Sequence, residues 1–332
     1  MPTLQAMLKE RPFLLADGAT GTNLFHMGLT SGDAPEIWNE EHPDRIKALY
    51  KMFVDAGADI ILTNTFGGNR RRLALHKADG RTHDINAKAA RLAREVADAA
   101  GRPVVVAGSV GPTGELFQPL GPLDHEEATA VFVEQIEGLK AGGADVIWIE
   151  TMSALEEMRA AAAASAKCCM PYTVTASFDT AGRTMMGITP EAFAQTISEL
   201  DPKPLAVGAN CGAGASDTLG SILAMTAACP DIVVISKANA GIPRYHEGHI
   251  HYSGTPELMA SYAGMAADAG ARIIGGCCGT SPEHLAGMRR ALDAHQKGPR
   301  PDHEAIKARI GPFLHKPAPT SGGAMEGRRR RT

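Results

Sequence analysis

One kind of segment recurs along the chain, and it restricts the possible folds more than any other feature. Its three clearest copies read DAGADIILTNT from Asp55, AGGADVIWIET from Ala141 and DAGARIIGGCC from Asp268. In each copy a helix-like pattern ends at Gly, which readily adopts the left-handed conformation that closes many helices. A short run that is apolar at nearly every position follows, as is typical of a parallel strand covered on both faces. The segment therefore predicts a helix followed by a buried strand.

Five further apolar runs fit the same role and begin at Pro12, Pro103, Tyr172, Leu205 and Ile232, which makes eight predicted strands. Helical patterns lie between them, at Asp44–Ala56, Asn86–Ala100, His125–Ala141, Leu155–Lys167, Pro190–Leu200, Asp217–Ala228 and Pro256–Ala269. Eight alternating strands and helices in roughly 300 residues predict an α/β protein, a (β/α)8 TIM barrel. An open doubly wound sheet is the alternative, but no G-x-G-x-x-G turn follows the first strand.

The composition supports a large buried core and argues against two classes of protein. Of the 332 residues 44% are hydrophobic, and the formal net charge of −4 argues against a general nucleic-acid-binding surface. We expect no membrane span, because no sufficiently long apolar run occurs. Six cysteines without a secretory segment indicate a reducing, cytoplasmic compartment.

The chain changes character near its C-terminal end. We expect residues 1–298 to form the barrel and residues 299–332 to form a C-terminal extension. The extension holds one short helical pattern, near Asp302–Ile310, and then reads KPAPTSGGAMEGRRRRT. Because this composition cannot bury much apolar surface, the extension is predicted to be largely disordered.

Chemically active side chains gather at the ends of the predicted strands. Those ends carry Asp17, Gly18 and Ala19 on the first strand, Glu150 on the fourth, Asn210 and Cys211 on the sixth, and Cys277 and Cys278 on the eighth. Sites in TIM barrels form at this C-terminal rim, so the sequence predicts one shared site there.

Three of these residues, Cys211, Cys277 and Cys278, predict a metal centre. Adjacent residues of a regular strand point to opposite faces, so Cys277 and Cys278 can share an ion only if the backbone turns. The glycines around them permit such a turn. Three soft thiolates with one open position favour a catalytic zinc ion, and three packed thiols are the alternative. The nearby motif HEGHIH, from His246, is interpreted as a polar loop rather than a second metal site.

A zinc ion with three thiolates suits the activation of a thiol. A substrate thiol in the open position would lose its proton and remain nucleophilic at neutral pH. The expected reaction is attack on an electrophilic carbon such as a methyl group. Asp17 and Glu150 are candidates to bind a substrate ammonium, and the amides of Gly18 and Ala19 to bind its carboxylate. Alternatively, Asp17 caps its turn and Glu150 pairs with a neighbouring residue.

At these residues the chain resembles the homocysteine methyltransferase family, which includes betaine–homocysteine methyltransferases and the homocysteine domain of cobalamin-dependent methionine synthase. The resemblance covers about residues 10–295 and rests on ADGATGTNL, AGADIILTNTFGGN, AGSVGPTG, GADVIWIET, GANCG, NAGIP and GGCCGTSPEH. It implies a barrel that binds zinc through Cys211, Cys277 and Cys278. It also implies that Asp17, Gly18 and Glu150 hold homocysteine, with Asn210 in support, and that methionine is the product.

The resemblance leaves the methyl donor open. Betaine enzymes of the animal type carry an aromatic residue after the first strand and a Tyr after the Phe that ends the second; the corresponding places here are near Asp33 and at Gly67. Their Tyr after the glutamate of the fourth strand is Thr151 here. At these points the chain is more similar to methionine synthase, but it lacks the length for folate and cobalamin modules.

As a whole, the chain looks most like short bacterial betaine–homocysteine methyltransferases, so glycine betaine is the favoured donor. A cationic donor would suit aromatic faces, for which Trp38, Phe66, Tyr245 and Tyr252 are candidates. Three alternatives remain: another onium donor such as S-methylmethionine, a split methionine synthase with a separate corrinoid protein, and a non-catalytic zinc-binding partner of such a protein. A metal-dependent hydrolase is disfavoured, since no H-x-H follows the first strand.

Overall fold

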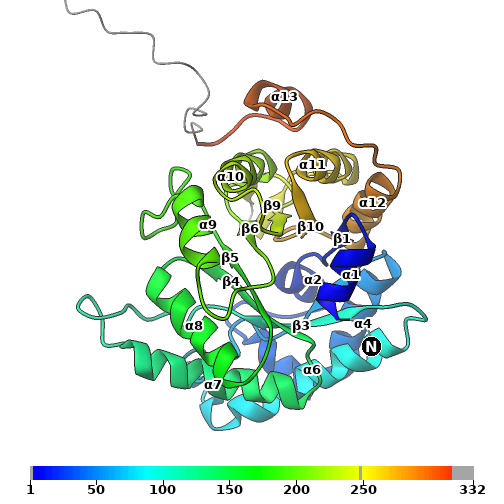
Figure 1. The fold of residues 1–332 in the computed structure, drawn as a ribbon. Coiled ribbons are helices and arrows are strands. Elements are labelled where there is room, and N and C mark those ends of the chain that lie inside the picture. The colour runs from blue at the N-terminus through cyan, green and yellow to red at the C-terminus, as the bar shows by residue number, and fades with distance from the viewer. Residues whose placement is uncertain (1–2, 247–248, 316–332) are drawn as a thin grey trace, which may run out of the picture.

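The structure, a computed structural model, describes residues 3–246 and 249–315. Within them, eight parallel strands form a nearly closed barrel that helices surround (Figure 1). The strand order is β1-β10-β7-β6-β5-β4-β3-β2, and a bridge between Ala16 and Ile60 joins β1 to β2. The strands are β1 (Leu14–Leu15), β2 (Ile60–Leu62), β3 (Val105–Val110), β4 (Val146–Met152), β5 (Tyr172–Ala176), β6 (Val207–Cys211), β7 (Val234–Ala238) and β10 (Ala271–Gly276). The predicted α/β class and TIM barrel are confirmed.

The connecting helices pack around the outside of the barrel. They are α4 (Pro43–Asp55), α6 (Thr82–Asp98), α7 (His125–Ala141), α8 (Leu155–Lys167), α9 (Pro190–Ser198), α10 (Ala215–Ala228), α11 (Pro256–Asp268) and α12 (Pro282–Asp293). Local signals set their starts: the side chains of Thr189 and Thr255 cap α9 and α11, each followed by Pro at the first helical position. The first seven match the predicted helices within a few residues, whereas α12 was not predicted. No described helix has the length and apolarity needed to span a bilayer.

The barrel interior holds an apolar cluster toward its N-terminal end, which a helix closes. Trp148 fills the interior among aliphatic side chains of the other strands, and α1 (Leu4–Glu10) contributes Leu4, Met7 and Leu8 to the same cluster. At this end Asp59, 2% exposed, forms ion pairs with three arginines: Arg11 at 2.7 Å, Arg289 at 3.1 Å and Arg102 at 3.7 Å. This arrangement leaves the opposite end of the barrel for the site.

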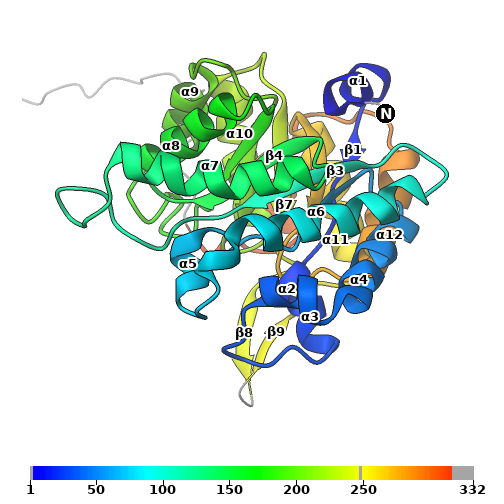
Figure 2. The same cartoon turned by 90° about the horizontal axis from the view of Figure 1, so that it is seen from below.

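The C-terminal end of the barrel carries elements that were not predicted from the sequence. They are α2 (Thr20–His26), η1 (Pro35–Ile37), α3 (Trp38–Glu41), α5 (Arg70–Ala74), η2 (Asp79–Arg81) and a hairpin of β8 (Pro243–His246) and β9 (His249–Tyr252). Figure 2 shows α2, α3 and the hairpin at the end of the molecule opposite α1. The segment predicted as a polar loop thus has a β-hairpin backbone, while the side chains of His246, His249 and His251 lie outside the described residues.

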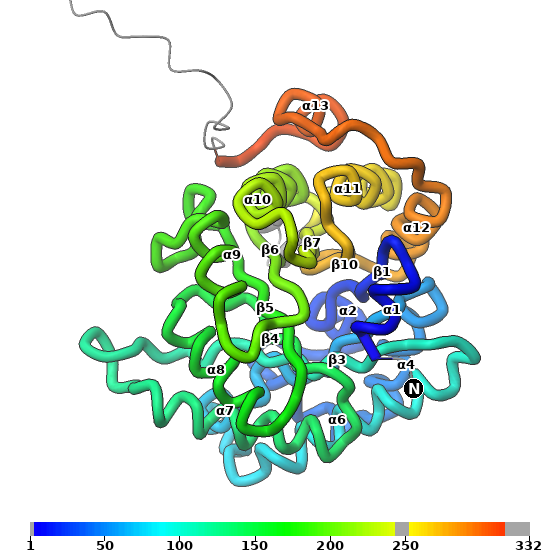
Figure 3. The backbone as a smooth tube through the Cα atoms, in the orientation of Figure 1, coloured from blue at the N-terminus to red at the C-terminus, as the bar shows by residue number. Residues whose placement is uncertain are grey.

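The described part of the C-terminal extension packs against the barrel. Helix α13 (His303–Arg309) confirms the predicted helical pattern, and Ile306 in it is fully buried. Figure 3 shows this segment running across α10 and α11. Arg300 donates to the carbonyls of Leu223 in α10 and of Ala269 directly after α11, and the backbone N–H groups of Leu314 and His315 donate to Asp217 on α10. The disorder predicted for the rest concerns residues 316–332, which lie outside the described residues.

Candidate active site

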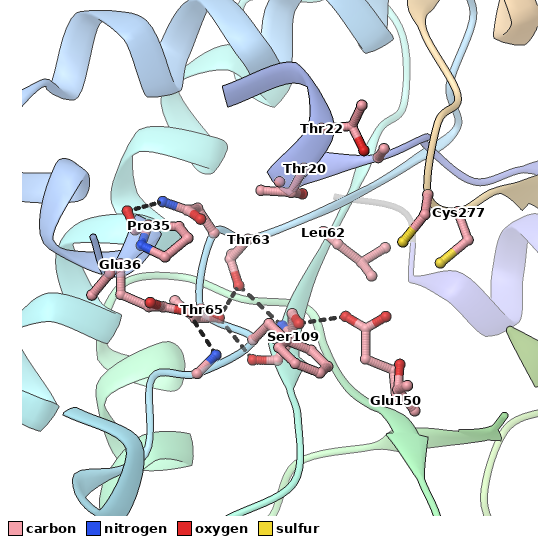
Figure 4. A pocket seen from close by; sticks show the side chains of 18 of the residues that line it. Thr20, Thr22, Pro35, Glu36, Leu62, Thr63, Thr65, Ser109, Glu150 and Cys277 are labelled. Atoms are coloured by element: carbon pink, nitrogen blue, oxygen red, sulfur yellow. Dashed lines mark hydrogen bonds between the residues drawn. The ribbon is translucent and has the colours of Figure 1, made fainter. Parts of the chain in front are cut away.

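A cavity of about 390 Å³ opens at the C-terminal ends of the strands. Its inner end is formed by Gly18, Ala19, Ser109, Glu150, Thr151, Cys211, Lys237, Cys277 and Cys278, and its outer end by residues that include Asp33, Pro35, Glu36, Phe66, Gly67, Arg72 and His76. Figure 4 shows Cys277 and Glu150 on one side of this space and Glu36 on the far side. One cavity therefore joins the predicted thiol cluster to a second group of polar side chains.

The three predicted thiols meet at the inner end. The Sγ atom of Cys211 lies 3.4 Å from that of Cys277 and 3.5 Å from that of Cys278. Cys211 ends β6 with φ of 61°, a conformation that residues other than Gly rarely adopt outside functional or turn positions. After β10 the backbone turns as required: the N–H of Cys277 donates to Ala238 and the carbonyl of Cys278 accepts from Ala240. Two adjacent cysteines thus face one point.

This geometry fits a zinc ion. Four ligands in a tetrahedron at Zn–S distances of about 2.3 Å place sulfurs ~3.8 Å apart, close to the spacing found here. Hydrogen bonds from the thiols of Cys211 and Cys277 lower the pKa of Cys278 well below its usual value, so the cluster favours a thiolate before any ion binds. Within the described residues, this is the sole group of three or more Cys, His, Asp or Glu side chains with metal-binding geometry.

Glu150 lies beside the thiols, at the end of β4. The residue is 9% exposed, and its carboxylate accepts a hydrogen bond from the Ser109 hydroxyl at 2.5 Å. Burial raises the pKa of Glu150 to about 7, although Lys237 and Ser109 act in the opposite direction. An empty site near neutral pH therefore holds Glu150 as a mixture of acid and carboxylate, and a cation placed beside it would favour the carboxylate.

Asp17 is paired below the cavity rather than exposed in it. Its Oδ1 lies 2.6 Å from Nζ of Lys237, and its Oδ2 accepts from the N–H of Leu62, also at 2.6 Å. Asp17 is 2% exposed and is not among the residues that line the cavity. Asp17 was expected to bind the substrate ammonium, but both of its oxygens have partners within the protein.

Gly18 and Ala19 bring backbone to the cavity wall. A Cβ atom on Gly18 would lie 2.7 Å from the Phe53 ring and 2.7 Å from the Thr280 hydroxyl, so only Gly fits where the chain passes. The N–H of Ala19 donates to the carbonyl of Thr280 at 3.3 Å, whereas the N–H of Gly18 has no acceptor among the described residues. Of the two amides proposed for the substrate carboxylate, that of Gly18 is free.

Asn210 supports the site from outside the cavity lining. Its amide donates to the Thr151 hydroxyl at 2.7 Å and accepts from the Thr151 N–H at 3.1 Å. Thr151, like Cys211, has a positive φ, of 59°. Asn210 does not line the cavity, although it was proposed to contact substrate. Its position indicates that it holds the strained ends of β4 and β6 together.

Three polar residues of the site were not among the site residues predicted from the sequence. Ser109 and Asn239 lie in the motifs AGSVGPTG and NAGIP, which carry the family resemblance, and Lys237 lies near the end of the apolar run IVVISKAN. A lysine inside this run was the signal available for Lys237, because a buried strand does not otherwise carry a charge. Asn239 donates to the carbonyl of Gly212 at 2.9 Å and so ties β7 to the turn after Cys211.

Among the residues whose side chains the structure describes, Phe66 is the one aromatic that lines the outer end of the cavity. Gly67, where animal-type betaine enzymes have Tyr, donates its N–H to Glu36 Oε1 at 2.6 Å, and a Cβ there would lie 3.0 Å from that oxygen. Phe66 lines the cavity. Of the other aromatic candidates, Trp38 is buried outside the cavity wall and Tyr252 contacts the Cys278 thiol; the side chain of Tyr245 lies outside the described residues.

Comparison with known proteins decides the family. The family model described as "Homocysteine S-methyltransferase" matches residues 14–292. The chain belongs to this family. It is 31% identical over 296 residues to methionine synthase from Mycobacterium tuberculosis, an alignment that covers 84% of this chain and 24% of the relative. It is 30% identical over 308 residues to methionine synthase from Mycobacterium leprae, covering 88% and 25%. The chain thus spans about a quarter of the length of these relatives.

The solved structures support the fold of this homocysteine S-methyltransferase family member. The metallated form of the homocysteine methyltransferase MmuM from Escherichia coli superimposes with a TM-score of 0.73 at 24% identity, covering 86% of this chain and 99% of that one. Its apo form superimposes with a TM-score of 0.68. These values confirm that the barrel and its surrounding helices follow the architecture of that enzyme.

Proposed function

We propose that this chain transfers a methyl group to the thiol of homocysteine, giving methionine, with a zinc ion bound by Cys211, Cys277 and Cys278. The observation that carries the proposal is the meeting of three thiols inside the cavity of a homocysteine S-methyltransferase family member. Bound there, zinc supplies the activation of a thiol, because a metal-coordinated thiol is deprotonated at neutral pH. We place the protein in the reducing cytoplasm, since disulfide formation among these thiols would remove the ligands.

The protein's own residues bind and orient the amino-acid end of homocysteine. Glu150 receives the substrate ammonium through the oxygen that Ser109 does not occupy, and the free N–H of Gly18 donates to the substrate carboxylate. Asp17 stays paired with Lys237 below the cavity floor and does not reach the substrate. Asn210 and Asn239 keep Cys211 and Thr151 in place, so the sulfur of homocysteine reaches the thiol cluster at one end of the cavity.

The transfer itself is a displacement at carbon. The sulfur lone pair of the homocysteine thiolate forms the new S–CH₃ bond while the bond from that methyl group to its carrier breaks. The carrier keeps the electron pair of the broken bond. In an onium donor, the positively charged nitrogen or sulfur atom therefore becomes neutral when it loses the methyl group. The donor must therefore lie beyond the homocysteine sulfur, toward the outer end of the cavity, where Glu36, Phe66 and Arg72 lie.

Glycine betaine is the first donor that we propose. It is an onium compound small enough for this cavity, and its loss of one methyl group gives dimethylglycine. Animal-type betaine enzymes have Tyr at the position of Gly67, and the Glu36 carboxylate occupies the space beside that position. A cation bound here would contact this carboxylate and the ring of Phe66. S-methylmethionine belongs to the same chemical class.

A methylated corrinoid carried by another protein is the second candidate, and two observations favour it. The curated relatives are methionine synthases of which this chain matches about a quarter. In addition, large apolar side chains are exposed on the segments that follow the C-terminal ends of β1, β2, β3 and β5, an arrangement that suits a protein partner; they are Phe25, Leu75, Leu116, Leu120, Met185 and Met186.

A donor panel tests both candidates. Zinc-loaded protein is incubated with homocysteine and either glycine betaine, S-methylmethionine or a methylcorrinoid, and methionine is measured. The Cys211→Ser variant is the matched control for each donor. Methionine with betaine, together with equimolar dimethylglycine, supports the first candidate; product with the methylcorrinoid alone supports the second. No methionine with any donor would leave a zinc-binding, non-catalytic role and contradict the proposed function.

A further inference from the structure

Lys237 is a buried cation at the floor of the cavity. It lies in β7 with its side chain inside the barrel, 2% exposed, and its Nζ lies 5.8 Å from the centre of the Trp148 ring. Its ion pair with Asp17 uses one of three ammonium hydrogens, and no other hydrogen bond from Nζ occurs within the described residues. Lys237 also lines the cavity, which Asp17 does not. Two N–H donors of the Lys237 ammonium are therefore available to a ligand in the cavity, at a position that is almost fully buried.

The charges around the thiols match those of an α-amino acid. Glu150 and Lys237 both line the inner end of the cavity, and each acts electrostatically on the other. The ion pair with Lys237 offsets the charge of Asp17, so Glu150 is the carboxylate left for a ligand ammonium. A ligand carboxylate has one free backbone donor here, the N–H of Gly18. A buried carboxylate with a single neutral donor would be poorly compensated for its lost hydration.

We propose that Lys237 binds the α-carboxylate of homocysteine, together with the Gly18 amide, while Glu150 binds the ammonium. Lys237 is then a specificity-determining residue that restricts the site to thiols carrying an α-amino acid group. Asp17 acts through it, by holding the ammonium in position from below. The inference rests on the proposed function, since it assigns a role toward the same substrate. The competing view is that Lys237 serves only as the counter-ion of Asp17.

The test removes the ion pair as a unit. A single Lys237→Met variant would leave Asp17 buried without a partner and risk misfolding. The double variant Asp17→Asn, Lys237→Met leaves no unpaired charge, and thermal unfolding shows whether it folds. The probes are homocysteine and aminopropanethiol, which is homocysteine without its carboxylate. Binding is followed in Co²⁺-loaded protein through the absorption change that a new thiolate ligand produces, so no methyl donor is needed.

The wild-type protein should bind homocysteine more tightly than aminopropanethiol. The double variant should lose roughly 10- to 150-fold in homocysteine affinity, the range of a charge-assisted hydrogen bond, and bind aminopropanethiol as before. A double variant that keeps the wild-type preference for homocysteine would overturn the inference and leave Lys237 as a counter-ion. If neither thiol changes the absorption of the wild-type protein, the proposed function fails, and this assignment fails with it.

Discussion

Replacing Glu150 by Gln should weaken homocysteine binding without disturbing the metal site. The substitution keeps the size of the side chain and an oxygen that can accept from the Ser109 hydroxyl, so its main effect is the loss of a negative charge. A charge-assisted hydrogen bond contributes about 1.5–3 kcal/mol, which corresponds to a loss of roughly 10- to 150-fold in affinity. Bound zinc should stay unchanged, because Glu150 is not one of the ligands proposed.

The pH dependence gives this prediction a second readout. Burial raises the pKa of Glu150 to about 7, so in the free protein the group is mostly neutral below that pH and ionised above it. Because the substrate ammonium requires the carboxylate, homocysteine affinity should rise as the pH increases from about 6 to about 8. Ionisation of the homocysteine thiol affects wild type and variant alike. The difference between their pH profiles therefore isolates Glu150, and Glu150→Gln should lack the component near pH 7.

Titration of Co²⁺-loaded protein with homocysteine measures both effects. Glu157→Gln is the matched control: Glu157 is another buried glutamate, 5% exposed, but it accepts from Thr113 and does not line the cavity. It should leave homocysteine affinity unchanged even if it lowers stability. The reasoning would be refuted if Glu150→Gln bound homocysteine like the wild type and with the same pH profile.

Three further predictions concern the metal and the fold. Cys211→Ser and Cys278→Ser should each lose most of the bound zinc in a metal assay, whereas Cys229→Ser should retain it; equal zinc in all three would reject the thiol cluster as the site. Removing zinc with a chelator should leave the far-ultraviolet circular dichroism unchanged and lower Tm only modestly, because the barrel core does not depend on the ion; collapse of the spectrum would show a structural metal instead. Asp59→Asn should destabilise the protein by about 3 kcal/mol in denaturant titration, since three arginines at the closed end of the barrel lose their shared carboxylate. Homocysteine affinity of that variant should match wild type, and an altered affinity would contradict the separation of the two ends.

The fold was largely predictable because its signal is local and repeated. Each buried strand is a short apolar run, and each helix before it ends near Gly, so strand positions and the barrel follow from the pattern. The three thiols were predictable for a related reason: residues at the ends of parallel strands meet on one rim. Cys211 and Cys278 are far apart in sequence, yet β6 and β10 are separated in the barrel by β7 alone.

The partners of the polar residues could not be predicted in the same way. Asp17 was assigned to substrate because it ends a strand, but its two oxygens are taken by Lys237 and by the backbone of Leu62. These partners come from strands that are far from Asp17 in the sequence. They meet Asp17 only when the barrel closes, so no local sequence pattern predicts the pairing. The family resemblance placed Asn210 in support of homocysteine binding, and the structure pairs its amide with Thr151 and directs its nitrogen to the Cys277 Sγ atom at 3.9 Å.

The loops at the cavity mouth were the least predictable part. Helices α2, α3 and α5 and the β8–β9 hairpin are short, and their sequences carry weak periodicity. Glu36, a charged residue in a one-turn helix, is 5% exposed because it accepts from Gly67 across the cavity wall. Sequence alone showed that the cage positions near Asp33 and at Gly67 lack aromatic residues, but not that a carboxylate fills the space beside one of them.

X-ray absorption at the zinc edge tests the central claim most directly, because it reports the atoms bound to the metal without requiring a methyl donor. Purified protein should contain about one zinc per chain, coordinated by three sulfurs and one lighter atom. Addition of homocysteine should replace the lighter atom with a fourth sulfur, and addition of aminobutyrate, which has no thiol, should not. Zinc bound without sulfur ligands, or a spectrum that homocysteine leaves unchanged, would contradict the claim that this cavity activates the homocysteine thiol.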